Sequence, residues 1–171
     1  GRAWMSVRLA RLAGVLQTCT SYALPPRNTS PTSSLAIQTA EARRTGKPLL
    51  VVLRCIPCEA CSQFDKQLLA RDNEVRDLFD RFVCARIVQA NGLDLSLFQF
   101  DYDQSFHAMF LNADRTVYGR FGTRSARPEQ ADMTMAGLRQ AMLAALELHT
   151  AYPANKALLA GKQPRPVEIR V

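Results

Sequence analysis

Residues 46–61 read Gly46-Lys-Pro-Leu-Leu-Val-Val-Leu-Arg-Cys55-Ile-Pro-Cys58-Glu-Ala-Cys61. The run Leu49–Leu53 is short and wholly apolar and contains β-branched residues, which predicts a strand buried on both faces. A strand of this kind usually belongs to a sheet that is covered by helices. Three cysteines at three-residue spacing follow the strand. No other group of residues in the sequence indicates a chemical function so clearly.

The cysteines are also predicted to lie at the start of a helix, in which Phe64 and Leu68 have core spacing. A helix N-terminus carries unpaired amide groups and a positive partial charge, so the pKa of a thiol there falls below the ~8.5 of a free thiol. Two cysteines that are two residues apart on the first turn can form a disulfide with one exposed and one shielded sulfur. The spacing therefore indicates a reversible dithiol rather than three thiols that pack a loop.

The rest of the chain predicts further elements in an α/β order. A helix capped by Ser33 or Ser34 is expected to end at Gly46. Downstream, the apolar patterns predict a second buried strand, a hairpin and a final helix, which cover residues 82–88, 107–121 and 134–149. The order of these elements predicts an α/β fold with a central mixed sheet and helices on both faces.

The formal net charge of +7 raises the question of a nucleic-acid partner. Residues 1–47 hold seven basic residues and one acidic residue, whereas residues 48–171 hold 15 basic and 14 acidic residues. Because a nucleic-acid footprint needs a cationic face on the folded body, we expect no nucleic-acid partner. No apolar run approaches the roughly 18 to 20 residues of a membrane span, so the chain is not expected to span a membrane.

The first stretch, Met5–Leu16, is basic and then apolar and lacks acidic residues, which is the outline of an export or transit peptide. An unstructured or partly helical leader is the equal alternative. Residues 20–33 are rich in Ser, Thr and Pro and are typical of a linker. We expect a leader and linker over 1–33, a domain over 34–149 and a C-terminal extension over 150–171. The expected location is the periplasm or another exported site, with the cytoplasm as the alternative.

The sequence resembles the thioredoxin-like superfamily, in particular bacterial thioredoxin-fold proteins of the thiol:disulfide interchange type. Those proteins show a helix ending in Lys-Pro, an apolar strand, a short loop and a C-x-x-C motif that opens a helix. The matching features are Lys47-Pro48, the strand Leu49–Leu53 and Cys58-Glu-Ala-Cys61, and the resemblance covers roughly residues 34–149. It implies a thioredoxin fold and a thiol–disulfide oxidoreductase that acts on protein disulfides. The implied protein is a monomer without a cofactor, with an upstream reductant as a second partner.

The resemblance leaves two registers for the active pair. Cys55-Ile-Pro-Cys58 is similar to the thioredoxin C-x-P-C motif, but it leaves no loop after the strand. Counting from Lys47-Pro48 favours Cys58 as the nucleophile and Cys61 as the resolving thiol. Cys55 is then a third thiol of the site, which can form an alternative pair with Cys58.

The sequence departs from the thioredoxin pattern at three places. Pro57 stands where thioredoxins have a Trp before the first active cysteine, and Val52 stands near their buried acid. Ser105 and Phe106 align with the Thr and cis-Pro of the family, and no proline lies between Pro57 and Pro128. In the family that proline lines the substrate groove and keeps metals off the cysteines. We therefore expect Pro57, Ser105 and Phe106 to line the substrate site, with metal capture more favourable than in ordinary thioredoxins.

Two other functions would use the same residues. Zinc would accept Cys55, Cys58 and Cys61 with either Cys84 or His107, and an iron–sulfur cluster would also need a fourth ligand. Metal binding is less favoured because paired C-x-x-C hooks are missing, so we expect no metal. A non-catalytic interaction module is the remaining alternative. Outside such a site, Cys84 is predicted to be an inert core thiol and His107 a half-buried structural residue rather than one that polarises a thiol.

Overall fold

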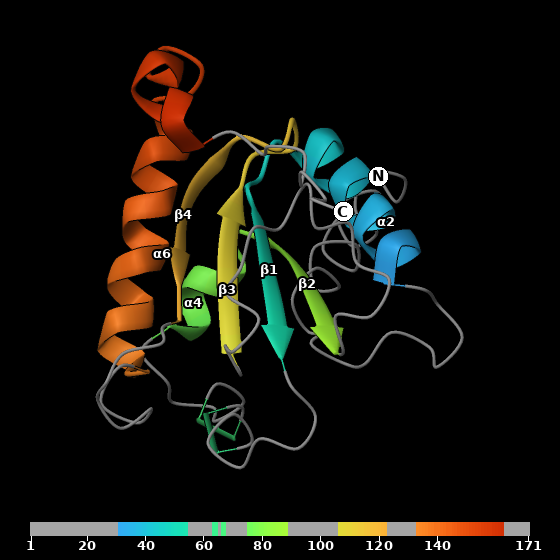
Figure 1. Cartoon of the computed structure of the whole chain (residues 1–171), viewed down its shortest axis with the longest axis vertical. Helices are drawn as coiled ribbons and strands as arrows, with labels where there is room; N and C mark the ends of the chain where they lie inside the picture. Colours follow the sequence, from blue (N-terminus) through green and yellow to red (C-terminus); the bar gives the residue numbers. More distant parts are fainter. Residues whose placement is uncertain are drawn as a thin grey trace, which may run out of the picture.

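A sheet of four strands organises the computed structural model of this chain (Figure 1). The strands are β1 (Leu49–Arg54), β2 (Val83–Val88), β3 (Phe106–Leu111) and β4 (Val117–Phe121), in the order β2-β1-β3-β4. Because β1 is parallel to β2 and antiparallel to β3, and β3 is antiparallel to β4, the sheet is mixed. The structure describes residues 31–54, 63–64, 66–67, 75–88, 106–122 and 133–162.

Helices cover both faces of the sheet. One face carries α2 (Pro31–Thr45), and the other carries α4 (Arg76–Phe79) and α6 (Met135–Thr150). The 3-10 helix η2 (Lys156–Lys162) follows α6. This arrangement confirms the predicted α/β architecture, in which a mixed sheet lies between helices.

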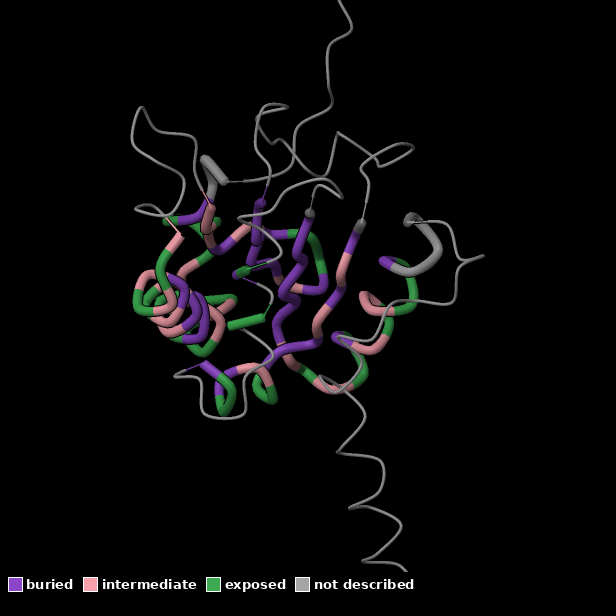
Figure 2. Tube along the Cα trace, turned by 90° about the horizontal axis from the view of Figure 1, so that it is seen from below, coloured by how far each residue is buried: buried purple, intermediate pink, exposed green. Residues whose placement is uncertain are grey.

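The apolar residues of β1 contribute to both hydrophobic layers. Leu50 and Val52 pack in the layer of α4 and α6, whereas Leu49, Val51 and Leu53 pack in the layer of α2. All five side chains are at most 5% exposed. Successive residues of a strand point to opposite faces, so a strand covered on both faces needs apolar residues at every position. Figure 2 shows these buried strands enclosed by helices whose outer sides are exposed.

Helix α2 begins at Pro31, earlier than the predicted caps Ser33 and Ser34. Proline suits the first position of a helix because its ring fixes φ near the helical value and no partner is needed there for an N–H group. The helix ends at Gly46, as predicted. Gly46 has a φ of +68°, which other residues adopt at a cost, and its N–H donates to the carbonyl oxygen of Ala42 at 2.9 Å.

The predicted hairpin is confirmed as β3 and β4. The side chain of Asp114 orders the turn between them, because its Oδ1 accepts the N–H of Thr116 at 3.0 Å and Nδ2 of Asn112 at 2.9 Å. The final helix also begins as predicted. The hydroxyl of Thr134 accepts the N–H of Gly137 at 3.0 Å and caps α6.

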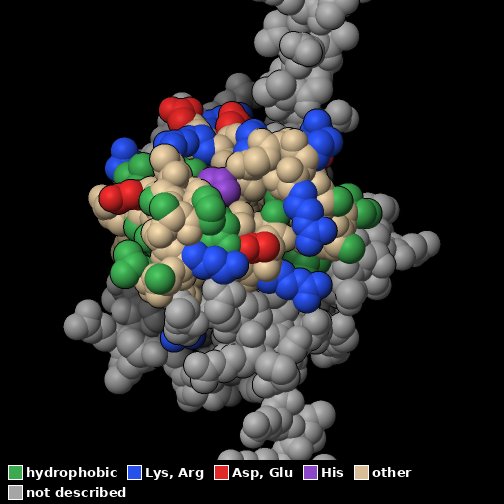
Figure 3. All heavy atoms as spheres, turned by 90° about the horizontal axis from the view of Figure 1, so that it is seen from above, with side chains coloured by type: hydrophobic (Ala, Val, Ile, Leu, Met, Phe, Trp, Pro, Cys, Tyr) green, Lys and Arg blue, Asp and Glu red, His purple; other side chains and the backbone are tan. Residues whose placement is uncertain are grey.

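A hydrogen-bonded clasp of Tyr118, His149 and Gly46 joins α6 to the sheet at the end where β1 begins. Nε2 of His149 lies 2.8 Å from the carbonyl oxygen of Gly46, and Nδ1 lies 2.9 Å from the hydroxyl of Tyr118. A carbonyl oxygen only accepts, so Nε2 of His149 donates to Gly46, and in the neutral tautomer that this bond selects Nδ1 accepts from the hydroxyl of Tyr118. Burial raises the pKa of Tyr118, which keeps that hydroxyl protonated. Figure 3 looks onto this end of the molecule, where acidic, basic and histidine side chains are mixed.

Candidate functional site

The four strands all begin or end near the last residue of β1, where Val88 of β2 is also aligned with Arg54. Arg54, the last residue of β1, is aligned with Phe106, the first residue of β3. Ala108 of β3 is in turn aligned with Phe121, the last residue of β4. Cys55 follows Arg54 in the sequence, so the cysteine cluster begins directly after this end of β1.

Most residues of the predicted site lie outside the part of the chain that the structure describes. They are Cys55, Pro57, Cys58, Cys61 and Ser105. The pairing of the cysteines, the identity of the nucleophile and the lining of the substrate site therefore stay predictions. The structure does describe Arg54, before the cysteines, and Phe64, after them, together with the strands that these two residues contact.

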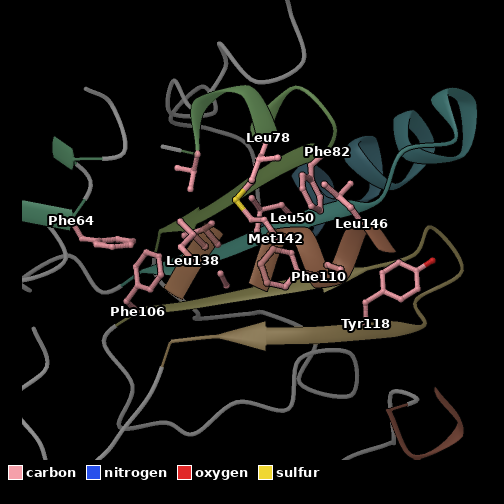
Figure 4. Packing of buried hydrophobic residues seen from close by; sticks show 14 of the residues in the cluster. Leu50, Phe64, Leu78, Phe82, Phe106, Phe110, Tyr118, Leu138, Met142 and Leu146 are labelled. Atoms are coloured by element: carbon pink, nitrogen blue, oxygen red, sulfur yellow. The ribbon is translucent and has the colours of Figure 1, made fainter. Parts of the chain in front are cut away.

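An aromatic trio of Phe64, Phe106 and Phe121 lies at the end of the sheet where β1 finishes. The ring centroids of Phe64 and Phe106 are 5.0 Å apart in an edge-to-face contact, and those of Phe64 and Phe121 are 6.3 Å apart. Figure 4 shows the rings of Phe64 and Phe106 beside each other at one end of the core, far from Tyr118. Phe64 is helical and 3% exposed, which confirms its predicted core position three residues after Cys61. The trio therefore ties the helix that follows the cysteines to the sheet.

Gly122 lies directly behind the first residues of β3. It has a φ of +105°, and a Cβ at this position would lie 2.5 Å from the carbonyl oxygen of Phe106 and 3.1 Å from Cα of His107. A side chain there would push β3 away from the end of β4, so the close approach requires glycine. Gly122 is not among the residues predicted for the site; the signal that the sequence offers is a glycine directly after the last strand of the hairpin.

Comparison with known proteins agrees with this geometry. A family described as thioredoxin-like matches residues 30–113. A crystal structure titled disulphide isomerase from Xylella fastidiosa Temecula1 has the same fold, with a TM-score of 0.50 and 18% identity over 70% of this chain and 93% of that chain. The chain has a thioredoxin-like fold. This confirms the predicted thioredoxin fold. A comparison with curated proteins found no match to the sequence.

In this thioredoxin-like chain, the side chain of Phe106 belongs to the core. It is 2% exposed and packs against Phe64, on the face of the sheet that α6 covers. Any contact that Phe106 makes with a substrate would therefore go through its backbone. Its predicted role in the substrate site stays a prediction.

His107 lies beside Phe106 but points to the opposite face, next to Leu53 on the side of α2. It is 1% exposed, so it is more deeply buried than predicted. Burial, with a smaller contribution from the positive charge of Arg120, lowers the pKa of His107 to about 4. The imidazole is therefore neutral near pH 7, in keeping with a structural residue.

The structure corrects the prediction for Cys84, which is disulfide-bonded rather than an inert thiol. Cys84 lies half-buried in the edge strand β2, with its Sγ 4.0 Å from the carbonyl oxygen of Phe79. The apolar pattern of β2 suggested a fully covered strand, but an edge position leaves room for a second sulfur.

The bond at Cys84 also affects the predicted zinc site of this thioredoxin-like protein. A sulfur in a disulfide does not supply the thiolate that zinc requires. His107, the other candidate fourth ligand, lies on the opposite face of the sheet from Cys84. Among the residues that the structure describes, no group of three or more His, Cys, Asp or Glu side chains is arranged to hold a metal ion.

Proposed function

We propose that this chain is a thiol–disulfide oxidoreductase that acts on protein disulfides through Cys58 and Cys61. The observation that carries the proposal is the common anchor on both sides of the cysteine cluster. Arg54, before the cluster, pairs with Phe106 in the sheet, and Phe64, after it, packs on the ring of the same Phe106. The segment between Arg54 and Phe64 is therefore held at both ends by the first residue of β3, which suits it to present its cysteines at the start of the helix that contains Phe64.

The proposed chemistry depends on the electrostatics of that helix start. Its unpaired N–H groups and the helix dipole favour the thiolate of Cys58 over the thiol. A thiolate with a pKa near the ambient pH combines a large reactive fraction with good nucleophilicity. The buried trio supports this function because it holds Phe64, three residues after Cys61, against the sheet.

In the reductive direction, the thiolate of Cys58 attacks one sulfur of a protein disulfide. A mixed disulfide forms, the substrate disulfide breaks, and the second substrate sulfur leaves as a thiolate that takes up a proton. Cys61 then loses its proton and attacks the sulfur of Cys58, which releases the first substrate sulfur as a second thiolate. The substrate gains two electrons and two protons, and the chain is left with a disulfide between Cys58 and Cys61. An upstream dithiol reductant would restore the two thiols.

Two substitutions at the active pair test this proposal. With dithiothreitol as the electron donor and insulin as the substrate, Cys58→Ser should abolish disulfide reduction. Cys61→Ser, reduced and then freed of dithiothreitol, should keep the first attack on insulin and accumulate a mixed disulfide, visible on a non-reducing gel. Cys55→Ser is the matched control and should retain most of the activity.

The alternatives predict different results in insulin reduction, metal analysis and mass spectrometry. Insulin reduction by Cys58→Ser at the rate of the unmodified chain would support a non-catalytic interaction module. Stoichiometric zinc or iron in anaerobically purified protein would support a metal site. A disulfide between Cys55 and Cys58 in the oxidised protein, identified by mass spectrometry, would favour the other register.

We further propose that the protein is exported, as a leader and linker over 1–33, a thioredoxin-like domain over 34–149 and an extension over 150–171. The disulfide at Cys84 supports an oxidising compartment, because cytosolic thiols are kept reduced. None of the helices in the described ranges is long and apolar enough to cross a membrane. Fractionation of cells expressing the chain, with N-terminal sequencing of the mature protein, tests the location and any cleavage.

A further inference from the structure

The outer side of α6 carries few charges for a helix at the surface of a protein. Four residues of α6 are buried against the sheet, so the opposite side of the helix faces outward (Figure 2). Surface helices usually carry charged residues on the outward side, as α2 does with the exposed Arg43 and Arg44. The outer face of α6 has three apolar side chains, one amide and one charge, and consists of Ala136, Gln140, Leu143, Ala144 and Glu147.

Two opposite charges lie at equal distances from Leu143, the middle of this outer face. Apart from His149, which belongs to the clasp, Arg139 and Glu147 are the only ionisable residues of α6. They lie four residues before and four residues after Leu143, about 12 Å from each other along the helix. Residues of one helix interact when they are three or four apart, so these two do not form a pair within α6.

The position of Glu147 is not explained by the stability of the helix itself. Glu147 lies in the last turn of α6, where the helix dipole disfavours a negative charge. Its side chain is exposed, so the carboxylate is available to a positive charge from outside the chain.

A second copy of α6 in the antiparallel direction complements both the apolar surface and the charges. A two-fold axis beside Leu143 relates each residue before it to the residue equally far before it in the other copy, which runs in the opposite direction. Arg139 of each copy then lies level with Glu147 of the other. The like charges are separated by about 12 Å along the pair. Ala136 and Ala144 have short side chains, which allows the two helices to approach closely.

We propose that two copies of this chain associate through the outer face of α6 in an antiparallel, two-fold pair with two Arg139–Glu147 ion pairs. The length of α6 limits the strength of this association. Sixteen residues form a helix about 24 Å long and about 10 Å across, so the contact is smaller than the about 1,200–2,000 Å² of a standard stable interface. We therefore expect a weak dimer that dissociates on dilution. It differs from the monomer that the resemblance implies, and it does not involve the cysteines.

Sedimentation velocity of the full chain tests for this dimer, with free thiols alkylated so that new disulfides cannot link two copies. Between about 5 μM and about 500 μM, the sedimentation coefficient should rise from that of a monomer to that of a dimer. Arg139→Glu and Glu147→Arg each place like charges level at both ends of the pair, so each should raise the Kd about tenfold. Arg43→Glu is the matched control for Arg139→Glu. It changes the net charge equally, but it lies on α2 across the sheet and should leave the Kd unchanged.

Mixing the two single variants gives the most specific test. In a mixed pair of Arg139→Glu and Glu147→Arg, each level again holds one acidic and one basic side chain. An equimolar mixture should therefore associate about as strongly as the unmodified chain, although neither variant does so alone. Recovery on mixing also shows that both variants are folded.

Three results would overturn the proposal. They are an unmodified chain that stays monomeric over the whole concentration range, single variants with an unchanged Kd, and a mixture that associates no better than its components. Far-UV circular dichroism of each variant is recorded on the same samples, so that loss of the dimer is seen separately from loss of the fold.

Discussion

A Cβ atom on Gly122 would lie 2.5 Å from the carbonyl oxygen of Phe106, well inside van der Waals contact. Gly122→Ala should therefore destabilise the fold by about 2–4 kcal/mol, from the clash and from the cost of a positive φ. Urea unfolding followed by circular dichroism measures this change. Gly119→Ala is the matched control, because a Cβ there meets nothing within 4 Å. Equal stability of the two variants would show that the approach at Gly122 is not close.

Phe64 connects the helix after the cysteines to the sheet through ring contacts with Phe106 and Phe121. Phe64→Ala should cost about 3 kcal/mol or more, because it removes a buried ring and leaves a cavity. It should also slow the formation of the mixed disulfide, since the start of the helix would no longer be fixed relative to the sheet. Both effects are measurable, by urea unfolding and by single-turnover reaction with a model disulfide.

Ile37→Ala on α2 is the control for that substitution. Ile37 is 62% exposed, so its truncation should change the free energy of unfolding by no more than about 0.5 kcal/mol. An equally small effect of Phe64→Ala would mean that the trio does not anchor the helix.

The sequence was sufficient to predict elements that depend on local chemistry. Leu49–Leu53 is apolar at every position because β1 is covered on both faces, and this is visible without knowing the partners. Gly46 at the end of α2 and Thr134 at the start of α6 are likewise local signals, and both predictions are confirmed.

Features that join distant parts of the chain could not be predicted in this way. The trio brings together Phe64, Phe106 and Phe121, whose separations in sequence carry no periodic signal. The disulfide bond at Cys84 is likewise not visible in the apolar pattern of β2, which predicted a core thiol. The predicted fold therefore identified the end of β1 after which the cysteines follow, but not the contacts of the aromatic trio.

His107 makes the stability of the protein depend on pH. Its pKa is about 4 in the folded chain, below its ordinary value of 6.5, so the unfolded chain binds the proton more tightly. The contribution of neutral His107 to the free energy of unfolding is therefore fully present above about pH 6.5. It is lost as the pH falls toward 4, by about 2–3 kcal/mol at pH 4.5. Urea unfolding between pH 7.5 and 4.5 should show this loss in the unmodified chain and a much smaller one in His107→Gln. An unchanged pH dependence in that variant would exclude His107 as the source.

Asp114 gives a second loss of stability at lower pH. Partial burial raises the pKa of its carboxyl group, but hydrogen bonds from Tyr152, Thr116 and Asn112 outweigh that effect and lower the pKa to about 2. Since the folded pKa is below the unfolded one, this contribution is present above about pH 4 and disappears as the pH falls toward 2. Asp114→Asn should therefore cost about 1 kcal/mol at pH 7, a figure reduced for the partial exposure of the carboxylate.

The difference between Asp114→Asn and the unmodified chain should vanish near pH 2. Urea unfolding at pH 7 and at pH 2.5 measures it, with Asp80→Asn, which replaces an exposed carboxylate after α4, as the control. The clasp at His149 should be unaffected, because it bonds to Gly46 and Tyr118 rather than to Asp114. If Asp114→Asn destabilised the chain equally at both pH values, the contribution of Asp114 would come from packing rather than from its charge.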